Sequence, residues 1–369
     1  MKITAAVTRA PCAPFVLEEV ELDPPGAGEV LVRIVGAGLC HTDLVAAEGL
    51  LPITMPAVFG HEGAGVVERV GAGVTKVKPG DNVAITFASC GHCPQCDRHA
   101  PAYCHAMAAL NFVGQRGDGS RSMRDGKGEI SGNFFGQSSF ATHALTTERN
   151  VVKVPDGVPL EIAGTLGCGI QTGAGAIMRS MACHENASLV VLGGGAVGLS
   201  AVMGAVLQKC GTIIVVEPNA NRRDLALSLG ATHAIDPSQS ADLAAAVRAI
   251  APHGVDFALD TSGIPAVIEA VPKLLAPRGT FGFVGVPPAH ATNLGLPGTL
   301  REAMRGGFTY RGIIEGDSDP DVFIPQLMSL YLAGRFPFDR LVKTYPLAEI
   351  NRAVAEQKQG LCVKPVLLP

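Results

Sequence analysis

The sequence is poor in charge and lacks long apolar runs. Charged residues make up 17% of the 369 residues, the formal net charge is −4 and the pI is about 6.2. The chain therefore has no basic face that could neutralise a phosphate backbone, and nucleic acid is a poor candidate partner. No uncharged run reaches the roughly 18 to 20 residues that span a bilayer, and no long apolar segment follows Lys2. We expect a cytoplasmic protein that does not contact a membrane.

Aromatic residues and cysteine are sparse as well. Tryptophan is absent, tyrosine occurs four times, and the ten cysteines fall far below the roughly 8 to 10% of a disulfide scaffold, which favours a reducing compartment. Glycine (45) and proline (26) are abundant, as expected where short strands turn often and backbone approaches a cofactor closely. The 47% apolar content can bury a sizeable core, and the length predicts about two domains.

The apolar runs indicate two kinds of domain. Up to about residue 168, short β-type runs such as 30–35, 65–70 and 81–85 alternate with glycine and proline, which predicts a β-rich domain. From residue 188 onward, strands and helices alternate. The strands expected there are residues 188–192, 212–216, 234–235, 255–259 and 280–284, and the helices are residues 196–209, 222–229, 241–250 and 265–275.

This alternation predicts an α/β protein whose second domain is a doubly wound parallel sheet. We expect the β-rich domain to span residues 1–169 and the parallel sheet to span residues 170–315. The C-terminal segment, residues 316–369, contains a helical stretch at 320–333 and is expected to return to the first domain. The polar stretch from Gly114 to Gly132 is predicted to be an exposed loop.

Four cysteines follow the spacing C-x2-C-x2-C-x7-C, at Cys90, Cys93, Cys96 and Cys104. A glycine and a proline inside the segment can bend several thiols toward one point. Four thiolates in a tetrahedron suit Zn²⁺ and leave no open coordination position. We therefore predict a structural zinc that orders a lobe over residues 88–106. An iron–sulfur cluster and four unligated thiols are the alternatives.

A second set of metal-ligand residues is dispersed along the first domain. Cys40, His61 and Cys168 each lie beside glycines that permit an irregular backbone. Taken singly, each is more often a packing or surface residue. Taken together, they supply the three protein ligands of a catalytic zinc and leave the fourth position open. The sequence therefore predicts a catalytic zinc held by these three residues.

A G-x-G-x-x-G motif lies at the start of the second domain, between a strand and a helix. Gly193 allows a tight turn, and Gly195 lets a pyrophosphate approach the backbone at the helix N-terminus, where Ala196 and Val197 begin the helix. Gly198 lets the helix pack closely on the strand. The motif alone is weak, but its position in a β-α-β unit predicts a dinucleotide site.

Glu217 closes the next strand, 217 − 193 = 24 residues after the first glycine. A carboxylate at this position can hydrogen-bond the ribose hydroxyls and repel a 2′-phosphate, which predicts NAD rather than NADP. A solvated charge at a strand end is the alternative interpretation. The neighbouring Arg222 and Arg223 leave room for use of both cofactors.

With these motifs in this order, the sequence resembles the zinc-dependent medium-chain alcohol dehydrogenases along nearly its whole length. The shared segments are residues 60–63, the four-cysteine spacing, residues 167–173 and residues 193–198. Residues 133–141 and 148–154 resemble the aryl (benzyl) alcohol dehydrogenase branch. The resemblance implies a GroES-like catalytic domain, a Rossmann domain with the active site in the cleft between them, and a homodimer or homotetramer.

The resemblance also implies roles for further residues. Glu62 would lie close to the catalytic zinc, Asp43 would orient the imidazole of His61, and Thr42 would place its hydroxyl beside the alcohol oxygen. Thr172 would pack on the nicotinamide, and Lys364 would bind the pyrophosphate. The cofactor contacts expected in all are His41, Thr172, Gly193, Gly195, Ala196, Val197, Gly198, Glu217, Arg222, Val284 and Lys364.

Two residues depart from the pattern of the relatives. His41 stands where many of them have arginine, and a mostly neutral imidazole should hold the pyrophosphate less tightly. Val45 replaces the histidine that ends the proton relay of the animal-type enzymes. The proton that Thr42 accepts must therefore leave through the ribose hydroxyl and water, or through another base.

These observations predict an enzyme that uses NAD and two zinc ions per chain to oxidise a primary, aromatic (benzyl-type) alcohol to its aldehyde. A short aliphatic alcohol and S-(hydroxymethyl)glutathione, the formaldehyde adduct, are the alternative substrates. A non-catalytic NAD-binding protein on the same fold is a further alternative, because fold alone does not establish activity. The retained Cys40, His61, Cys168 and Thr42 argue against it, since a sensor has no need of an open metal site.

Overall fold

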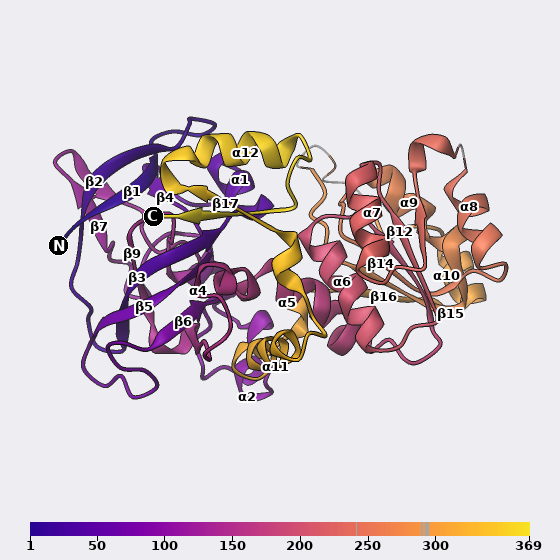
Figure 1. Ribbon diagram of the computed structural model, residues 1–369, viewed down its shortest axis with the longest axis horizontal. Coiled ribbons are helices and arrows are strands. Elements are labelled where there is room, and N and C mark those ends of the chain that lie inside the picture. Colours follow the sequence, from indigo (N-terminus) through magenta and orange to yellow (C-terminus); the bar gives the residue numbers. More distant parts are fainter. Residues whose placement is uncertain (241, 289–290, 292–294) are drawn as a thin grey trace. The chain divides into compact units, whose positions relative to one another are not determined.

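The computed structural model describes residues 1–240, 242–288, 291 and 295–369 (Figure 1). The chain divides into two compact units, one formed by Met1–Gly169 with Ser318–Pro369 and the other by Ile170–Asp317. Within the described residues, no helix has both the length and the apolar character needed to cross a membrane.

The first unit is β-rich and contains two sheets. The strands are β1 (Lys2–Thr8), β2 (Val16–Leu22), β3 (Glu29–Gly38), β4 (Ala57–Val58), β5 (Glu62–Val70), β6 (Asn82–Ile85), β7 (Met123–Asp125), β8 (Gly128–Ile130), β9 (His143–Thr147), β10 (Val151–Lys153), β17 (Val342–Pro346) and β18 (Lys364–Leu368). One sheet has the order β4-β1-β2-β7-β8, and the other has the order β10-β6-β5-β3-β18-β17 with β9 also paired to β3.

The C-terminal strand completes the second of these sheets. β18 runs antiparallel to β3, with Val366 opposite Gly38, and parallel to β17. In Figure 1 the yellow C-terminal strands accordingly lie with the indigo and violet strands of the N-terminal segment. The helices of this unit are α1 (His41–Ala47), α2 (Pro94–Asp97), α3 (Met107–Asn111), α4 (Leu160–Ala163), α11 (Pro320–Leu332) and α12 (Ile350–Lys358).

The prediction of an exposed loop from Gly114 to Gly132 is wrong for its second half, which forms the β7–β8 hairpin. Asp125 stabilises the turn, because its carboxylate accepts hydrogen bonds from the backbone N–H groups of Lys127 and Gly128. Met123 and Ile130 fill the core beneath the hairpin. Two isolated apolar residues in a polar stretch were too weak a pattern to indicate these short strands.

The second unit is a six-stranded parallel sheet with the order β13-β12-β11-β14-β15-β16. Numbered from its first strand, this order is 3-2-1-4-5-6, the order of dinucleotide-binding sheets. The strands are β11 (Ser188–Leu192), β12 (Thr212–Val216), β13 (His233–Ile235), β14 (Val255–Asp260), β15 (Leu275–Phe283) and β16 (Thr309–Gly312), and the helices are α6 (Ala196–Leu207), α7 (Ala220–Ser228), α8 (Leu243–Ile250), α9 (Pro265–Leu274) and α10 (Leu300–Gly306).

The strands and helices expected in this unit are present. The strands β11 and β12 were readily predicted, because they are nearly continuous apolar runs that suit burial in a parallel sheet. The structure confirms the predicted α/β class with a parallel sheet in the second unit. The helix predicted from residue 241 begins at Leu243, and residue 241 itself lies outside the described residues.

Candidate active site and metal centres

Four candidate metal ligands meet in the first unit, although 168 − 40 = 128 residues separate the outermost two. One ligand atom from each of Cys40, His61, Glu62 and Cys168 lies within 4.8 Å of the others. Cys40 is the N-cap of α1, His61 directly precedes β5, Glu62 begins it, and Cys168 precedes helix α5 (Gly169–Gly175). The four residues therefore project from the ends of elements, where the backbone is free to turn toward a common point.

Asp43 connects two members of this group. Its fully buried carboxylate accepts hydrogen bonds from the backbone N–H groups of Cys40 (2.9 Å) and Gly60 (3.0 Å). The Asp43 Oδ1 atom also lies 2.8 Å from Nδ1 of His61. The carboxylate of Asp43 thus fixes the backbone of Cys40 and the ring of His61.

The remaining nitrogen of the imidazole provides a test of whether a metal fits. Because Asp43 engages Nδ1, Nε2 is the ring atom left to face the thiols and Glu62. Nε2 is buried and has no hydrogen-bond partner among the described residues. A buried polar atom without a partner is costly, and a metal ion held with Cys40 and Cys168 would remove this cost. The mixed nitrogen and sulfur set fits a catalytic zinc.

Glu62 forms a buried ion pair with Lys364. The amine of Lys364 donates to both carboxylate oxygens of Glu62, at 2.8 and 2.9 Å, and Gly169 N–H donates to one of them at 3.1 Å. Gly38 is required beneath this pair, because a Cβ there would lie 2.0 Å from Glu62 Oε2. Lys364 was predicted to bind the pyrophosphate, but in this structure its amine is bonded to Glu62 beside the candidate metal site.

The charges around the group favour a thiolate at Cys40. A hydrogen bond from Cys168 and the positive charge of Lys364 hold the pKa of Cys40 well below its usual range, although burial acts against them. Burial lowers the pKa of His61, but the carboxylate of Asp43 outweighs it and the pKa is raised overall. Burial raises the pKa of Glu62 even though Lys364 opposes this effect.

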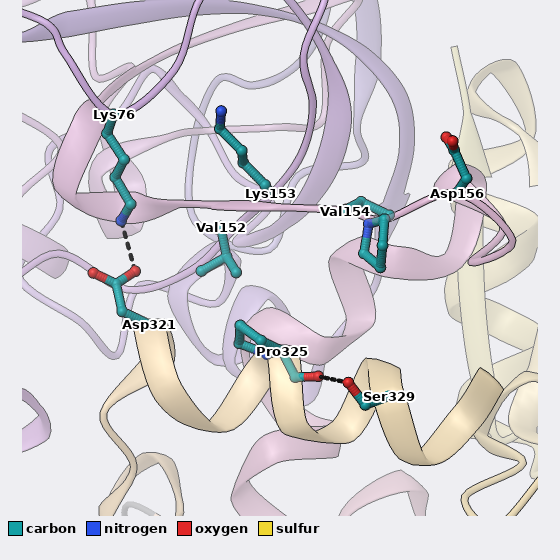
Figure 2. Close-up of a pocket in the computed structure, with 9 residues that line it drawn as sticks. Lys76, Val152, Lys153, Val154, Asp156, Asp321, Pro325 and Ser329 are labelled. Atoms are coloured by element: carbon teal, nitrogen blue, oxygen red, sulfur yellow. Dashed lines mark hydrogen bonds and ion pairs between the residues drawn. The ribbon is translucent and has the colours of Figure 1, made fainter. Parts of the chain in front are cut away.

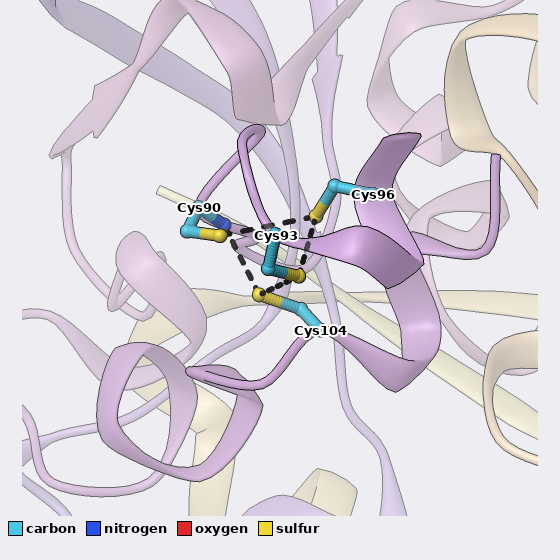
Figure 3. A group of neighbouring side chains, drawn as sticks. All are labelled: Cys90, Cys93, Cys96 and Cys104. Atoms are coloured by element: carbon cyan, nitrogen blue, oxygen red, sulfur yellow. Dashed lines mark hydrogen bonds between the residues drawn. The ribbon is translucent and has the colours of Figure 1, made fainter. Parts of the chain in front are cut away.

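The second candidate metal site is the four-cysteine lobe (Figure 3). The sulfur of Cys93 lies 3.6 Å from that of Cys96 and 4.0 Å from that of Cys104, and Cys90 Sγ lies 4.0 Å from Cys96 Sγ. Zinc–sulfur bonds of about 2.3 Å in a tetrahedron place neighbouring sulfurs about 3.8 Å apart. The four thiols therefore fit a structural zinc.

The lobe has only a small buried cluster of its own, although Ala102 within it joins the main core of the unit. The buried cluster of the lobe consists of the cysteines themselves with Ala106 and Met107 packed against them. Backbone N–H groups of His105 and Cys96 lower the pKa of Cys93 to about 5, whereas burial raises the pKa of Cys104 to about 11. A metal that takes four thiolates would remove this imbalance and join the segments that carry the four cysteines.

In the second unit, the glycine-rich turn has the geometry that its sequence predicts. Gly193 has a φ of +108°, and a Cβ on Gly198 would lie 1.9 Å from the carbonyl oxygen of Gly193. A Cβ on Gly195, at the N-cap of α6, would meet no atom within 4 Å. The first glycine thus makes the turn, the third allows close packing, and the second leaves open space at the helix N-terminus.

Glu217 lies at the end of β12, beside this turn. Its carboxylate accepts hydrogen bonds from the backbone N–H groups of Gly194 (2.7 Å) and Asn219 (2.8 Å). Arg223 donates to the carbonyl oxygen of Glu217 and pairs with Asp236. A negative charge is therefore fixed at the turn, while the guanidinium of Arg223 is already engaged.

The remaining predicted residues lie in both units. Thr42 is half-buried with its Oγ1 atom 3.8 Å from Cys40 Sγ, whereas His41 is exposed and Val45 half-buried on the same helix. In the second unit, the hydroxyl of Thr172 donates to Glu315 at 3.4 Å. The backbone N–H of Arg222 donates to the cap of α7, and that of Val284 donates to the carbonyl oxygen of Asp260.

Sequence reasoning missed two residues that contact the candidate ligands. The ring of Phe135 stacks on the imidazole of His61 with ring centroids 4.5 Å apart. The amide of Gln137 hydrogen-bonds the backbone on both sides of Glu62. Neither has a diagnostic spacing, since a buried phenylalanine looks like any core residue in a sequence. The three consecutive polar residues that follow Gly136 were the available signal.

A surface pocket of the first unit lies apart from these groups, between β10 and α11 (Figure 2). Both of its lysines are paired: Lys76 bonds Asp321 at 2.6 Å, and Lys153 bonds Asp81 at 2.9 Å. The residues that line the pocket are Lys76, Val152, Lys153, Val154, Pro155, Asp156, Asp321, Pro325 and Ser329.

Comparison with known proteins places the whole chain among related sequences. A family model described as the alcohol dehydrogenase GroES-like domain matches residues 26–156, and one described as a zinc-binding dehydrogenase matches residues 196–331. A geraniol dehydrogenase of Castellaniella defragrans is 48% identical over 366 residues, covering 99% of this chain and 97% of that protein.

Two crystal structures are similar over all of this chain and 99% of their own. The benzyl alcohol dehydrogenase of Acinetobacter calcoaceticus matches with a TM-score of 0.94 and 40% identity. A protein of Burkholderia ambifaria, described as an alcohol dehydrogenase zinc-binding domain protein, matches with a TM-score of 0.95 and 49% identity.

Proposed function

The chain belongs to the zinc-dependent medium-chain alcohol dehydrogenase family, and from this premise we propose that it exchanges a hydride between a primary alcohol and NAD at a zinc held by Cys40, His61 and Cys168. The observation that carries the proposal is the convergence of these residues with Glu62 in one buried group. Nε2 of His61 supports it, because this buried atom has no hydrogen-bond partner among the described residues.

The residues around the metal would divide the chemical work. When bound, zinc acts as a Lewis acid that lowers the pKa of the alcohol toward neutrality. Lys364 neutralises Glu62, so the two thiolates of Cys40 and Cys168 balance the charge of the metal. Thr42, beside Cys40, relays the proton that the alcohol loses: its hydroxyl takes up this proton while it passes its own proton on toward water. Asp43 holds the imidazole of His61 in one tautomer.

Thr42→Val tests the proton acceptor, because valine keeps the shape of threonine without its hydroxyl. We expect turnover to fall about 100-fold, the lower end for the loss of a positioned acid or base, while the zinc content stays at two per chain. Unchanged turnover would exclude Thr42 as the proton acceptor. Thr42→Ser, which keeps the hydroxyl and loses only one methyl group, is the matched control and should leave turnover close to that of the unaltered chain.

We propose NAD as the preferred cofactor. The carboxylate of Glu217 is fixed by two backbone N–H groups and nine-tenths or more buried, so a 2′-phosphate would meet a negative charge that cannot turn away. Glu217→Ala should therefore raise kcat/KM with NADP relative to NAD. A preference for NADP in the unaltered chain would contradict this assignment.

For the substrate, we propose a primary alcohol whose carbinol carbon is attached to an unsaturated, planar group. Phe135 covers one face of His61, and Phe112 packs edge-on against Phe135, which gives the surroundings of the metal an aromatic character. A benzyl-type alcohol is the first candidate. A terpene alcohol such as geraniol is the second, since a geraniol dehydrogenase is 48% identical to this chain. In both, an sp² carbon follows the carbinol carbon.

A panel of matched alcohols tests this proposal. Benzyl alcohol is compared with cyclohexylmethanol, and geraniol with citronellol, so that each pair differs in unsaturation next to the carbinol carbon but little in size. Ethanol and S-(hydroxymethyl)glutathione complete the panel. NADH formation is measured for each on protein whose zinc content is known. Faster turnover of the unsaturated member of each pair supports the proposal, and equal turnover within pairs, or a preference for ethanol or the glutathione adduct, overturns it.

A further inference from the structure

The turn formed by residues 133–139 lies against the backbone that carries His61 and Glu62. Gln137 is fully buried, and its side-chain oxygen accepts from the N–H of Gly63 at 3.0 Å. Its side-chain nitrogen donates to the carbonyl oxygen of His61 at 2.9 Å. Gly63 must be a glycine for this contact, because a Cβ there would lie 2.6 Å from that of Ser139. One amide therefore holds the peptide groups on both sides of Glu62.

The same turn supplies the ring that lies on His61. The phenyl ring of Phe135 stacks on the imidazole with an interplanar angle of 26°, while the ring of Phe134 meets it edge-on at 85°. The hydrogen bond to Asp43 fixes one atom of the imidazole, and a ring held at one atom can still tilt about that point. The stacked ring restricts this tilt, which sets where Nε2 points.

The turn adopts an unusual backbone conformation to present this ring. Phe135 has a φ of +51° and Ser138 also has a φ of +51°, in the left-handed region that side chains other than glycine rarely adopt. The hydroxyl of Ser138 stabilises the turn, since it accepts from the N–H of Phe134 and donates to the carbonyl oxygen of Val58. Such strain persists where surrounding contacts compensate it, and it is frequent at functional sites.

We propose that Phe135 and Gln137 are positioning residues for the catalytic metal: Phe135 fixes the plane of the His61 ring, and Gln137 fixes the backbone from which His61 and Glu62 project. The inference rests on the proposed catalytic zinc at this site. It predicts that the turn affects metal binding at His61 separately from its contribution to the stability of the surrounding core.

Two substitutions test the proposal without introducing charge. Phe135→Leu removes the stacked ring but stays apolar. Gln137→Met keeps length and volume but removes the hydrogen bonds to Gly63 and His61, together with a longer one of 3.5 Å to the carbonyl oxygen of Thr86. Phe15→Leu is the matched control, because Phe15 packs in the same aromatic cluster on Phe59 and Phe140 without contacting the ring of His61. Phe135→Tyr keeps an aromatic ring at the stacking position and serves as the conservative variant.

Two measurements are made on the holoprotein, with the melting temperature recorded for each variant. The first is the rate at which a chromogenic chelator removes each of the two zinc ions. The second is the absorption spectrum after Co²⁺ has replaced the catalytic zinc, which reports the geometry of the ligands. We expect Phe135→Leu and Gln137→Met to lose the catalytic metal about 10- to 100-fold faster and to shift the cobalt bands, with release of the other zinc unchanged.

The controls separate positioning from general loosening. Phe15→Leu should lower the melting temperature without changing the cobalt bands, and Phe135→Tyr should resemble the unaltered chain. Unchanged release and spectra in the two test variants, or an equal shift in Phe15→Leu, would overturn the proposal. If Phe135→Leu does not fold, Gln137→Met decides. A single zinc in the unaltered chain would instead contradict the proposed function.

Discussion

The two cysteine-containing metal sites of the first unit are assembled in opposite ways. The four-cysteine lobe takes all its ligands from one segment, residues 90–104, and its own buried cluster is built around the cysteines themselves. The group of Cys40, His61, Glu62 and Cys168 draws its members from segments far apart in the chain, and buried residues engage each side of it. We infer that the first metal stabilises its protein surroundings, whereas the second is held in place by them.

The chemistry of the ligands follows the same division. Four thiols satisfy a tetrahedral zinc completely, so such a site is closed to substrate. Two thiols and an imidazole leave a position open, and Glu62 is prevented by Lys364 from carrying a free charge into it. The comparison therefore predicts that damage to one site appears as lost stability, and damage to the other as lost turnover.

Cys168→Ser should produce the largest effect, and the effect should be on turnover. Weakening the zinc site removes several kcal/mol of stabilisation from the transition state, roughly a thousandfold in rate. We expect zinc content to fall from two to one per chain, with little change in melting temperature. Metal analysis, steady-state kinetics and calorimetry on the same preparation check this. Full activity with full zinc content would exclude Cys168 as a ligand.

Cys104→Ala should produce the next largest effect, and here stability should fall. A structural zinc contributes roughly 10 kcal/mol to the folding of a zinc-finger peptide, and a third of this would lower the melting temperature by about 10 °C. Limited proteolysis should cut within residues 90–104 first. An unchanged melting temperature in a protein that has lost this zinc would break the comparison, because the lobe would then be stable without its metal.

Asp43→Asn should have a smaller effect, specific to the dispersed site. An asparagine can still contact His61 but carries no charge to favour the required tautomer, and loss of such a partner costs about 10- to 100-fold in metal affinity or activity. Asp97→Asn is the matched control, because Asp97 is an exposed acidic residue beside Cys96 in the lobe. If Asp43→Asn and Asp97→Asn reduced the zinc affinity of their own sites equally, the proposed difference between the two sites would be contradicted.

The smallest effect is expected from a charged cluster around Glu356, which belongs to neither metal site. A substitution there should change the stability of the fold but neither zinc content nor turnover. Lys343, Tyr345 and Arg352 lower the pKa of Glu356 from its ordinary 4.5 to about 2. A carboxyl whose pKa is lower in the folded state favours folding above pH 4.5, and this contribution is lost as the pH falls from about 4.5 to 2.

Glu356→Gln should therefore flatten the loss of stability in this acid range. Both metal sites also release zinc in acid, so the quantity to measure is the difference in unfolding free energy between the variant and the unaltered chain at each pH. At pH 7 the two proteins should have equal zinc content and turnover. Parallel pH profiles would show that the cluster does not contribute to folding.

The sequence determined the features that depend on neighbours in the chain. The spacing of Cys90 to Cys104 indicated one metal site, and the apolar runs with the glycine motif at residues 193–198 indicated the parallel sheet and its turn. These features are legible because the period of a strand or helix, and the reach of a short loop, are set by local backbone geometry. The β7–β8 hairpin was missed because its short strands carry too little of such a local pattern.

The tertiary structure decided which distant side chains meet. A sequence shows Lys364 as a residue of a C-terminal strand, but pairing of β18 with β3 brings it to Glu62. It shows Phe135 as an apolar residue, but the left-handed turn lays its ring on His61. Contacts of this kind depend on the register of strands and on the strain a turn can bear. Both are set by the packing of the whole unit, which no local pattern encodes.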